Sequence, residues 1–264
     1  MKQLLAEVIG IKKVLPGCVR PHARDILGSY LIWLKCPEIG CAAKPGQFVM
    51  VRCGNDCALP RPFSIHQVDK EGNIALFFAV WENGKGTNWL AQRCIGNTVE
   101  LFGPLGSGFS IRSEAKNLLL VAGGTGIAPL EFLALAALKK KKTVTLLYGT
   151  ANDQRCQISA DIRLVSATED GTLGIKGTAI ELIPQFIDQA DQIFACGPMA
   201  MYHAMARMPE LKLKPVQVSL EIMMGCGRGV CYGCTIKTKQ GLKEVCQDGP
   251  VFDLDDILWD ELTC

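Results

Sequence analysis

The sequence has almost no net charge and only three histidines. Its 28 Lys and Arg residues nearly balance 26 Asp and Glu residues, giving +2, so charge gives no reason to expect nucleic acid as a partner. The histidines, His22, His66 and His203, fit no metal-binding or catalytic-triad spacing. They are therefore expected to be surface or core residues. Internal repeats and low-complexity linkers are also missing.

The sequence also lacks a recognisable signal peptide or membrane span. Its first residues, MKQLLAEVIGIKKVLPG, have no sustained apolar core and no small-residue cleavage site. Residues 118–138 match a span in length, but they contain three glycines, Pro129 and Glu131. A buried strand, a tight turn and a buried helix explain this stretch better. We therefore expect a cytoplasmic protein without membrane association.

Cysteine, in contrast, is abundant. The chain has thirteen cysteines, and an odd number without a secretory signal argues for a reducing compartment and against a disulfide framework. Nine of them stand apart from the carboxyl-terminal cluster, and most are expected to fill the core. A second metal site at Cys53 and Cys57 is a weaker alternative, since no further ligand pair accompanies them. The nine are Cys18, Cys36, Cys41, Cys53, Cys57, Cys94, Cys156, Cys196 and Cys264.

The other four cysteines form a motif. Cys226, Cys231, Cys234 and Cys246 follow the spacing C-x4-C-x2-C-x11-C, which is typical of plant-type [2Fe–2S] ferredoxins. Glycines between them keep side chains away, so that backbone N–H groups can point at the sulfurs. Zinc is the alternative, but zinc ribbons usually bring two C-x2-C pairs, and only Cys231 and Cys234 form one here.

The residue pattern changes near position 115. Before it, residues 47–53, 74–80 and 97–103 are expected strands with turns and one short helix (87–95) between them, which indicates an antiparallel barrel or sandwich. After it, expected strands at 117–123, 143–149, 161–168 and 192–197 alternate with helices at 129–141 and 178–189, which indicates a parallel sheet covered by helices. We predict a multidomain protein: a β-barrel (1–112), an α/β domain (113–215) and a small cluster domain (216–264).

A glycine turn follows the first strand of the α/β domain. Gly123, Gly124, Thr125 and Gly126 join that strand to a helix, where small residues and free N–H groups can receive a pyrophosphate. A later strand ends in Cys196, Gly197 and Pro198, which are expected to face the same crevice because ligands bind at the carboxyl ends of parallel strands. The alternative for these three is a plain strand-to-helix turn.

Two further motifs lie in the barrel half. Arg61, Pro62, Phe63 and Ser64 form RPFS, in which Arg61 can pair with phosphate and Ser64 can hydrogen-bond a ring nitrogen. The alternative is an exposed loop. Gly86 and Thr87 form a small-residue turn that can hold a phosphate, although the sequence around it is not a P-loop.

The order RPFS, GKGT, GPLGSGF, GGTGIAP, CGPM resembles the ferredoxin–NADP reductase superfamily. MGCGRGVCYGC with VCQDGPVF is similar to the electron-transfer subunits of NAD-dependent (type B) dihydroorotate dehydrogenases. The resemblance covers essentially the whole chain. It implies NAD as co-substrate at the glycine turn, a [2Fe–2S] cluster on the four cysteines, and FAD on the barrel. The FAD residues that it implies are Arg61, Pro62, Phe63, Ser64, Phe78, Ala79, Val80, Gly86 and Thr87. Some relatives carry Arg at the position of Val80, so a contact there would be through the backbone.

The resemblance also implies a division of labour. Electrons would come from an FMN-containing partner that oxidises dihydroorotate in pyrimidine biosynthesis, in an expected heterotetramer of two copies of each chain. They would pass through the cluster and FAD to NAD+. No residue here is suited to abstract the substrate proton, so no catalytic residue is expected on this chain.

Three alternatives remain. Related modules serve NADH-dependent ferredoxin:NADP+ oxidoreductases and sulfide dehydrogenases, and a zinc-stapled binding protein is a third possibility. NAD and NADP are not distinguished by the residues, because Asp153 suits a ribose hydroxyl and Arg155 suits a 2′-phosphate.

Overall fold

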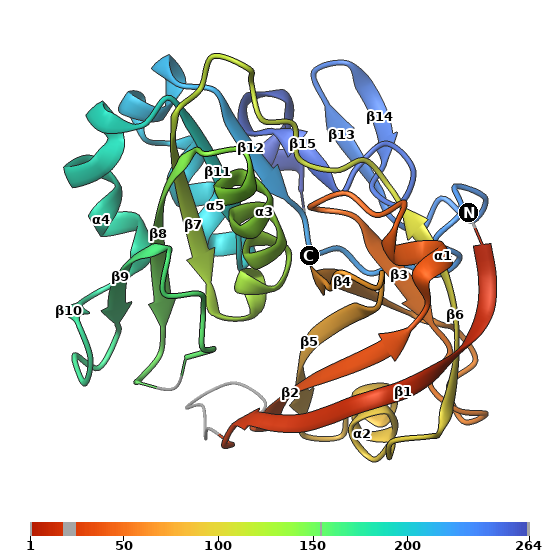
Figure 1. Cartoon of the computed structure of the whole chain (residues 1–264). Coiled ribbons are helices and arrows are strands. Elements are labelled where there is room, and N and C mark those ends of the chain that lie inside the picture. The colour runs from red at the N-terminus through yellow and green to blue at the C-terminus, as the bar shows by residue number, and fades with distance from the viewer. Residues whose placement is uncertain (1, 18–24, 154, 263–264) are drawn as a thin grey trace.

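The computed structural model describes residues 2–17, 25–153 and 155–262 (Figure 1). Cys18, His22 and Cys264 therefore lie outside the described residues. The chain forms a β-barrel beside an α/β domain, and a carboxyl-terminal hairpin lies above the barrel in the view of Figure 1.

The amino-terminal half is a closed barrel of six antiparallel strands in the order β1-β2-β5-β4-β3-β6, as predicted. Its interior is apolar, with Ile32, Val49 and Leu76 fully buried. The elements are β1 (Lys2–Leu15), β2 (Ile26–Lys35), α1 (Pro37–Gly40), β3 (Phe48–Val51), β4 (Arg61–Val68), β5 (Ile74–Trp81), α2 (Lys85–Ala91) and β6 (Thr98–Leu105).

RPFS begins strand β4 and is not an exposed loop, which corrects the alternative drawn from the sequence. Pro62 is compatible with the strand because residues 61–64 pair with β3, while the pairing with β5 starts only at Ile65. Proline has no backbone N–H, so a strand tolerates it where one side makes no hydrogen bonds to a neighbouring strand.

The second half is built on a seven-stranded sheet of order β10-β9-β8-β7-β11-β12-β15, in which only β15 is antiparallel to its neighbour. Helices cover both faces. The elements are β7 (Asn117–Gly123), η1 (Gly124–Gly126), α3 (Ile127–Lys139), β8 (Thr143–Thr150), β9 (Arg163–Thr168), β10 (Ile175–Lys176), α4 (Ala179–Phe186), η2 (Ile187–Gln189), β11 (Gln192–Cys196), α5 (Met199–Ala206), η3 (Pro209–Leu213) and β12 (Val216–Ser219).

The central strand β7 shows why these strands are continuously apolar. Leu118 and Leu120 pack with residues of α3, whereas Leu119 and Val121 pack with residues of α4 and α5 on the opposite face. A strand between two helical layers buries both of its faces. The more peripheral β9 is partly exposed, so the expectation of burial on both faces does not hold for it.

The carboxyl-terminal part consists of a cysteine-rich loop, the hairpin β13 (Thr235–Thr238) and β14 (Gly241–Glu244), strand β15 (Val251–Asp253), and the turns η4 (Leu254–Asp256) and η5 (Trp259–Glu261). Strands β12 and β15 fall within the range 216–264 yet pair in the α/β sheet. The predicted division after residue 215 therefore passes through one sheet, and the domain limits stay a prediction.

The three parts also share their apolar core. One buried cluster contains Met50 and Leu105 of the barrel, Val121 of the sheet, and Cys234 and Cys246 of the carboxyl-terminal part. The cysteine loop is thus fixed against both other parts. None of the helices within the described ranges is long and apolar enough to cross a membrane.

Candidate functional site: a cysteine cluster beside a nucleotide cavity

The four motif cysteines lie together as two pairs. Cys226 and Cys231 are close enough to influence each other's ionisation, and the backbone N–H of Cys246 donates to the Sγ of Cys234 at 3.4 Å. Within the described ranges, no three Cys, His, Asp or Glu side chains converge to hold a single metal ion. Four cysteines gathered in one place suit an iron–sulfur cluster held by four thiolates.

Backbone amides are directed at these sulfurs. The N–H groups of Arg228 and Val230 donate to the Sγ of Cys226 at 3.3 and 3.5 Å, and the N–H of Gly229 donates to the Sγ of Cys246 at 3.2 Å. Such bonds stabilise negative charge on sulfur and tune the potential of a bound cluster.

The pKa values of the thiols differ between the two ends of the site. Burial by itself raises the pKa of Cys226, but the N–H groups of Arg228 and Val230 outweigh it and lower that pKa to about 6. Burial, followed by the neighbouring thiol of Cys234, raises the pKa of Cys246 to about 12. Closely packed thiolates repel one another, so all four ionise together only when a cation compensates their charge. The donor set therefore fits an iron–sulfur cluster.

Glycines leave the space that such a group needs. A Cβ added at Gly225 or Gly233 would lie 3.4 or 3.6 Å from the Sγ of Cys231. Gly229 has a φ of +70°, and a Cβ there would meet Gln247 at 2.4 Å. Gly225 and Gly233 thus leave space beside the sulfur of Cys231, and glycine is required at position 229 by its φ and by the nearby Gln247.

The cysteine loop packs directly on the barrel. A Cβ at Gly227 would lie 2.5 Å from the Cγ of Met50, and Met50 is the cross-strand partner of Pro62 in RPFS. The guanidinium of Arg228 lies 4.3 Å from the ring centre of Phe102 on β6. The loop thus reaches the strand that neighbours the predicted flavin residues.

The predicted flavin residues lie partly at the exposed surface and partly in the interior of the barrel. Arg61 is exposed, and a Cβ at Gly86 would lie 3.4 Å from its Cγ, so the two motifs RPFS and GKGT meet in space. Phe63 and Phe78 contact each other edge to face with ring centres 5.6 Å apart, inside the barrel. Val80 is also buried there, which leaves only its backbone for any ligand contact. The roles of these residues stay a prediction.

A cavity of about 450 Å³ lies between the barrel and the carboxyl ends of β7, β8 and β11, within the size range of small-molecule sites. The barrel contributes Ser29, Phe77 and Trp81. The α/β domain contributes the predicted residues Gly123, Gly124, Thr125 and Pro198 together with Tyr148, Thr150, Asn152, Glu169, Thr178, Met201 and Glu221.

The glycine turn at this cavity has two different requirements. Gly124 has a φ of +54°, and a Cβ there would meet nothing within 4 Å, so its backbone is open to a ligand. Gly126 faces inward, where a Cβ would lie 1.9 Å from the carbonyl oxygen of Cys196. The two predicted nucleotide motifs are therefore in direct contact.

Cys196 itself does not face the cavity as expected. It is buried, and its Sγ lies 3.9 Å from the Oε1 of Glu221, which does line the cavity. The N–H of Gly197 donates to the hydroxyl of Tyr202 at 2.9 Å, and that hydroxyl donates to the carbonyl of Ser219 at 2.6 Å. These bonds fix the turn after β11.

Phe77 and Glu221 also line the cavity but were not predicted from the sequence. Strand alternation was the available signal for Phe77, because side chains at neighbouring positions of β5 point to opposite faces. Glu221 had no local signal, since it reaches the cavity only because β12 lies beside β11.

Two carboxylates, those of Glu169 and Glu221, line the cavity. Glu169 lines it, and no Lys or Arg of the described ranges is among its lining residues. Arg155, the candidate for a 2′-phosphate, instead donates to the hydroxyl of Ser166. A carboxylate suits ribose hydroxyls and repels an added phosphate.

The remaining cysteines are mostly core residues, as expected. Cys36, Cys53, Cys57 and Cys156 are buried, while Cys41 and Cys94 are exposed. The metal-site alternative for Cys53 and Cys57 finds no third ligand in the described ranges.

Two family models match this chain. The iron–sulfur cluster binding domain of dihydroorotate dehydrogenase B matches residues 221–258, and the oxidoreductase FAD-binding domain matches residues 32–109. The first range includes all four cysteines, and the second includes RPFS and GKGT.

Curated relatives are similar over most of the chain. The electron transfer subunit of dihydroorotate dehydrogenase B (NAD(+)) from Desulforamulus reducens is 39% identical over 247 residues, which cover 88% of this chain and 93% of that protein. The subunit of the same name from Clostridium acetobutylicum is 34% identical, and the match covers 79% of this chain and 84% of that protein.

Solved structures are similar as well. A structure of NADH-dependent reduced ferredoxin-NADP oxidoreductase has a TM-score of 0.82 at 26% identity, covering 98% of this chain and 91% of that chain. A ferredoxin NADP+ reductase from Neisseria gonorrhoeae with bound FAD and NADP has a TM-score of 0.59 at 17% identity, covering 77% and 89%. The latter supports the fold alone.

Proposed function

This chain belongs to the family of electron transfer subunits of NAD(+)-dependent dihydroorotate dehydrogenase B, and we propose that it passes electrons from a dihydroorotate-oxidising partner to NAD+. In this proposal Cys226, Cys231, Cys234 and Cys246 hold a [2Fe–2S] cluster. RPFS and GKGT hold FAD, and the cavity receives NAD. When bound, FAD supplies the exchange between single electrons and a hydride.

The main support is the contact between the cysteine loop and the barrel. Gly227 packs on Met50, and Met50 pairs with Pro62. A Cβ at Gly225 would lie 3.8 Å from Leu59, two residues before Arg61. The chain thereby holds its cluster ligands against the strand assigned to FAD, as a relay requires.

The cavity supports NAD over NADP. Glu169 lines it without any described Lys or Arg, so its chemistry suits free ribose hydroxyls. The open backbone at Gly124 and the amino-terminal turn of α3 suit the pyrophosphate.

The partner is proposed to be an FMN-containing catalytic subunit, with two copies of each chain in the complex. Val230 and Tyr232, which flank the exposed Cys231 in the sequence, are 69% and 68% exposed, and Met223, three residues before Cys226, is 90% exposed. Apolar side chains gathered at a surface indicate a docking site. The abundance of free thiols suits a cytoplasmic location.

The test separates the two subunits. The isolated chain is expected to oxidise NADH with an artificial acceptor, because that reaction needs only its FAD and NAD sites. It is expected not to oxidise dihydroorotate, since the base that abstracts the substrate proton is proposed to belong to the FMN subunit. Adding the FMN subunit should create dihydroorotate-dependent NAD+ reduction. Dihydroorotate turnover by the isolated chain would overturn the proposal.

A second candidate is the flavin and iron–sulfur module of an NADH-dependent ferredoxin:NADP+ oxidoreductase. The structural match over 98% of the chain favours it. The two candidates differ in the electron donor, so reduction of the chain by ferredoxin but not by the dihydroorotate-oxidising subunit would select the second.

A further inference from the structure

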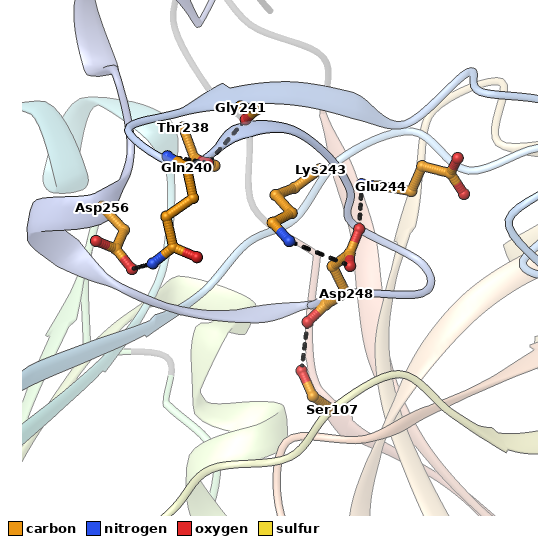
Figure 2. A network of polar contacts seen from close by, with 8 residues as sticks. All are labelled: Ser107, Thr238, Gln240, Gly241, Lys243, Glu244, Asp248 and Asp256. Carbon is orange, nitrogen blue, oxygen red and sulfur yellow. Dashed lines mark hydrogen bonds and ion pairs between the residues drawn. The ribbon is translucent and has the colours of Figure 1, made fainter.

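Cys246 lies in a small loop that is closed by reciprocal hydrogen bonds. The N–H of Glu244 donates to the Oδ2 of Asp248 at 2.8 Å (Figure 2). The N–H of Asp248 donates to the carbonyl of Glu244 at 2.7 Å. Lys243 adds an ion pair with Asp248 at 3.8 Å. The two ends of the loop that contains Cys246 are therefore tied to each other.

The same loop is tied to the barrel. The hydroxyl of Ser107, just after β6, donates to the carbonyl of Asp248 at 2.8 Å (Figure 2). The N–H of Ser107 donates to the carbonyl of Gly249 at 2.6 Å. A Cβ at Gly106 would lie 2.3 Å from that same carbonyl oxygen, so the two segments are in close contact.

The loop determines where the sulfur of Cys246 lies. Cys246 is buried, its Sγ accepts the N–H of Gly229 at 3.2 Å, and its own N–H donates to Cys234 at 3.4 Å. Both bonds depend on the position of the 244–248 loop relative to the rest of the cysteine loop. Neither Asp248 nor Ser107 touches a sulfur in these contacts, so both act through Cys246.

We propose that Asp248 and Ser107 are positioning residues that clamp the Cys246 loop to the barrel and thereby fix the fourth cluster ligand. This inference rests on the proposed function, because it takes the four cysteines as cluster ligands. It assigns a role to the Asp-Gly-Pro segment that follows Cys246, and it links the integrity of the cluster to the barrel.

Ser107→Ala tests the clamp without a change of charge. Loss of one neutral hydrogen bond is expected to speed iron release to a chelator roughly fivefold. It should also shift the cluster's reduction potential to a more negative value, because a looser Gly229 N–H···Sγ bond stabilises the reduced cluster less. Ser107→Thr keeps the hydroxyl and should restore both values.

Asp248→Ala removes the side-chain acceptor for Glu244. It is expected to speed iron release roughly tenfold to a hundredfold, since bonds to a carboxylate are stronger. Asp248→Asn keeps an acceptor oxygen and should lie nearer the wild type. The potential is not compared for the Asp248 variants, because loss of a nearby negative charge shifts it independently.

Gln240→Ala is the matched control. Gln240 lies in the turn between β13 and β14, the hairpin that leads into the Cys246 loop. Its side chain donates to Asp256 at 3.1 Å (Figure 2) and takes no part in the hydrogen bonds that close the Cys246 loop. It should leave iron release and potential unchanged. FAD content and the thermal unfolding midpoint are measured for every variant, so that general unfolding is recognised.

The outcomes separate this inference from the function on which it rests. A wild-type chain that binds no cluster, or a Cys246→Ser variant that keeps all its iron, would overturn the ligand assignment. Iron loss in Cys246→Ser, together with wild-type iron release in both Ser107→Ala and Asp248→Ala and a wild-type potential in Ser107→Ala, would overturn only the clamp.

Discussion

Arg61 is the residue at which two motifs separated in the sequence meet, since it lies beside Gly86. Its guanidinium is exposed and donates to the carbonyl of Leu59 at 3.2 Å, so it is available for a phosphate. We predict that Arg61→Ala weakens FAD binding by about 1.5–3 kcal/mol, or roughly tenfold to a hundredfold. FAD dissociation followed by flavin fluorescence measures this. Arg52→Ala, which removes an exposed arginine paired with Glu100, should leave FAD binding unchanged; an equal effect of both would show that only general charge matters.

His66 is buried between the barrel and α3, where its Nδ1 lies 2.9 Å from the carbonyl of Ala128. Burial lowers its pKa from 6.5 to about 4, although the bond to Ala128 opposes this. The unfolded chain therefore binds a proton between pH 6.5 and 4 that the folded chain does not, so stability falls as the pH falls through this window.

We predict that His66 accounts for a loss of about 3 kcal/mol in the free energy of unfolding by pH 4. Urea unfolding at several pH values gives the free energy of unfolding of the wild type and of His66→Gln. The difference between these two free energies should shrink toward low pH, because glutamine does not titrate. A difference that stays constant between pH 7 and pH 4 would show that His66 is not buried in its neutral form.

At the residue scale, the sequence predicted groups with a fixed spacing better than groups that meet through the fold. The four cysteines were found because ligand spacing is local. Glu221 was not, since it reaches the cavity through the pairing of β11 with β12. Phe78 and Val80 were named by resemblance, but their side chains are in the barrel core and Phe77 lines the cavity.

At the element scale, strands buried on both faces were the most predictable. β7 and the turn before α3 appear at the expected positions because a continuous apolar run followed by glycines has few alternatives. β4 was harder, since Pro62 argues against a strand. Its tolerance depends on the late start of the β5 pairing, which no local pattern reveals. β15 joins the sheet with only three residues, too few for a periodicity.

The turn between β7 and α3 allows a test of its contact with the end of β11. Gly126→Ala would place a Cβ 1.9 Å from the carbonyl oxygen of Cys196, and neither backbone can yield easily. We predict a loss of about 3 kcal/mol in stability and loss of NADH oxidation, measured by thermal unfolding and by activity with an artificial acceptor.

Gly124→Ala is the control in the same turn, because its Cβ would meet nothing within 4 Å. Its φ of +54° costs an alanine only about 1–2 kcal/mol. A Gly124 variant as unstable as the Gly126 variant would mean that backbone conformation, and not contact with β11, explains the glycines.

At the scale of the whole molecule, the three parts could be predicted but not their junctions. Composition distinguishes a barrel, an α/β sheet and a cysteine-rich end. The packing of Met50, Val121 and Cys246 in one core, and the return of β15 to the sheet, arise from long-range contacts. Residues of all three parts thus pack around the predicted cluster ligands Cys234 and Cys246.

This arrangement leaves one face of the cysteine loop at the surface, where Cys231 is exposed. Electrons from a partner must enter where the cluster is accessible, and Val230 and Tyr232 flank the exposed Cys231. We predict that Val230→Asp lowers dihydroorotate-dependent NAD+ reduction at least tenfold at limiting partner concentration. A carboxylate at an apolar contact must be desolvated without a partner charge.

The same variant should keep its cluster spectrum and its NADH oxidation with an artificial acceptor, because neither needs the partner. Leu213→Asp is the matched control, since Leu213 is 87% exposed but follows α5 outside the cysteine loop. Co-elution with the FMN subunit on size exclusion should be lost for Val230→Asp and kept for Leu213→Asp. If Val230→Asp binds the partner and turns over like the wild type, the docking face lies elsewhere; electrons would then enter the chain by a route that does not pass Cys231.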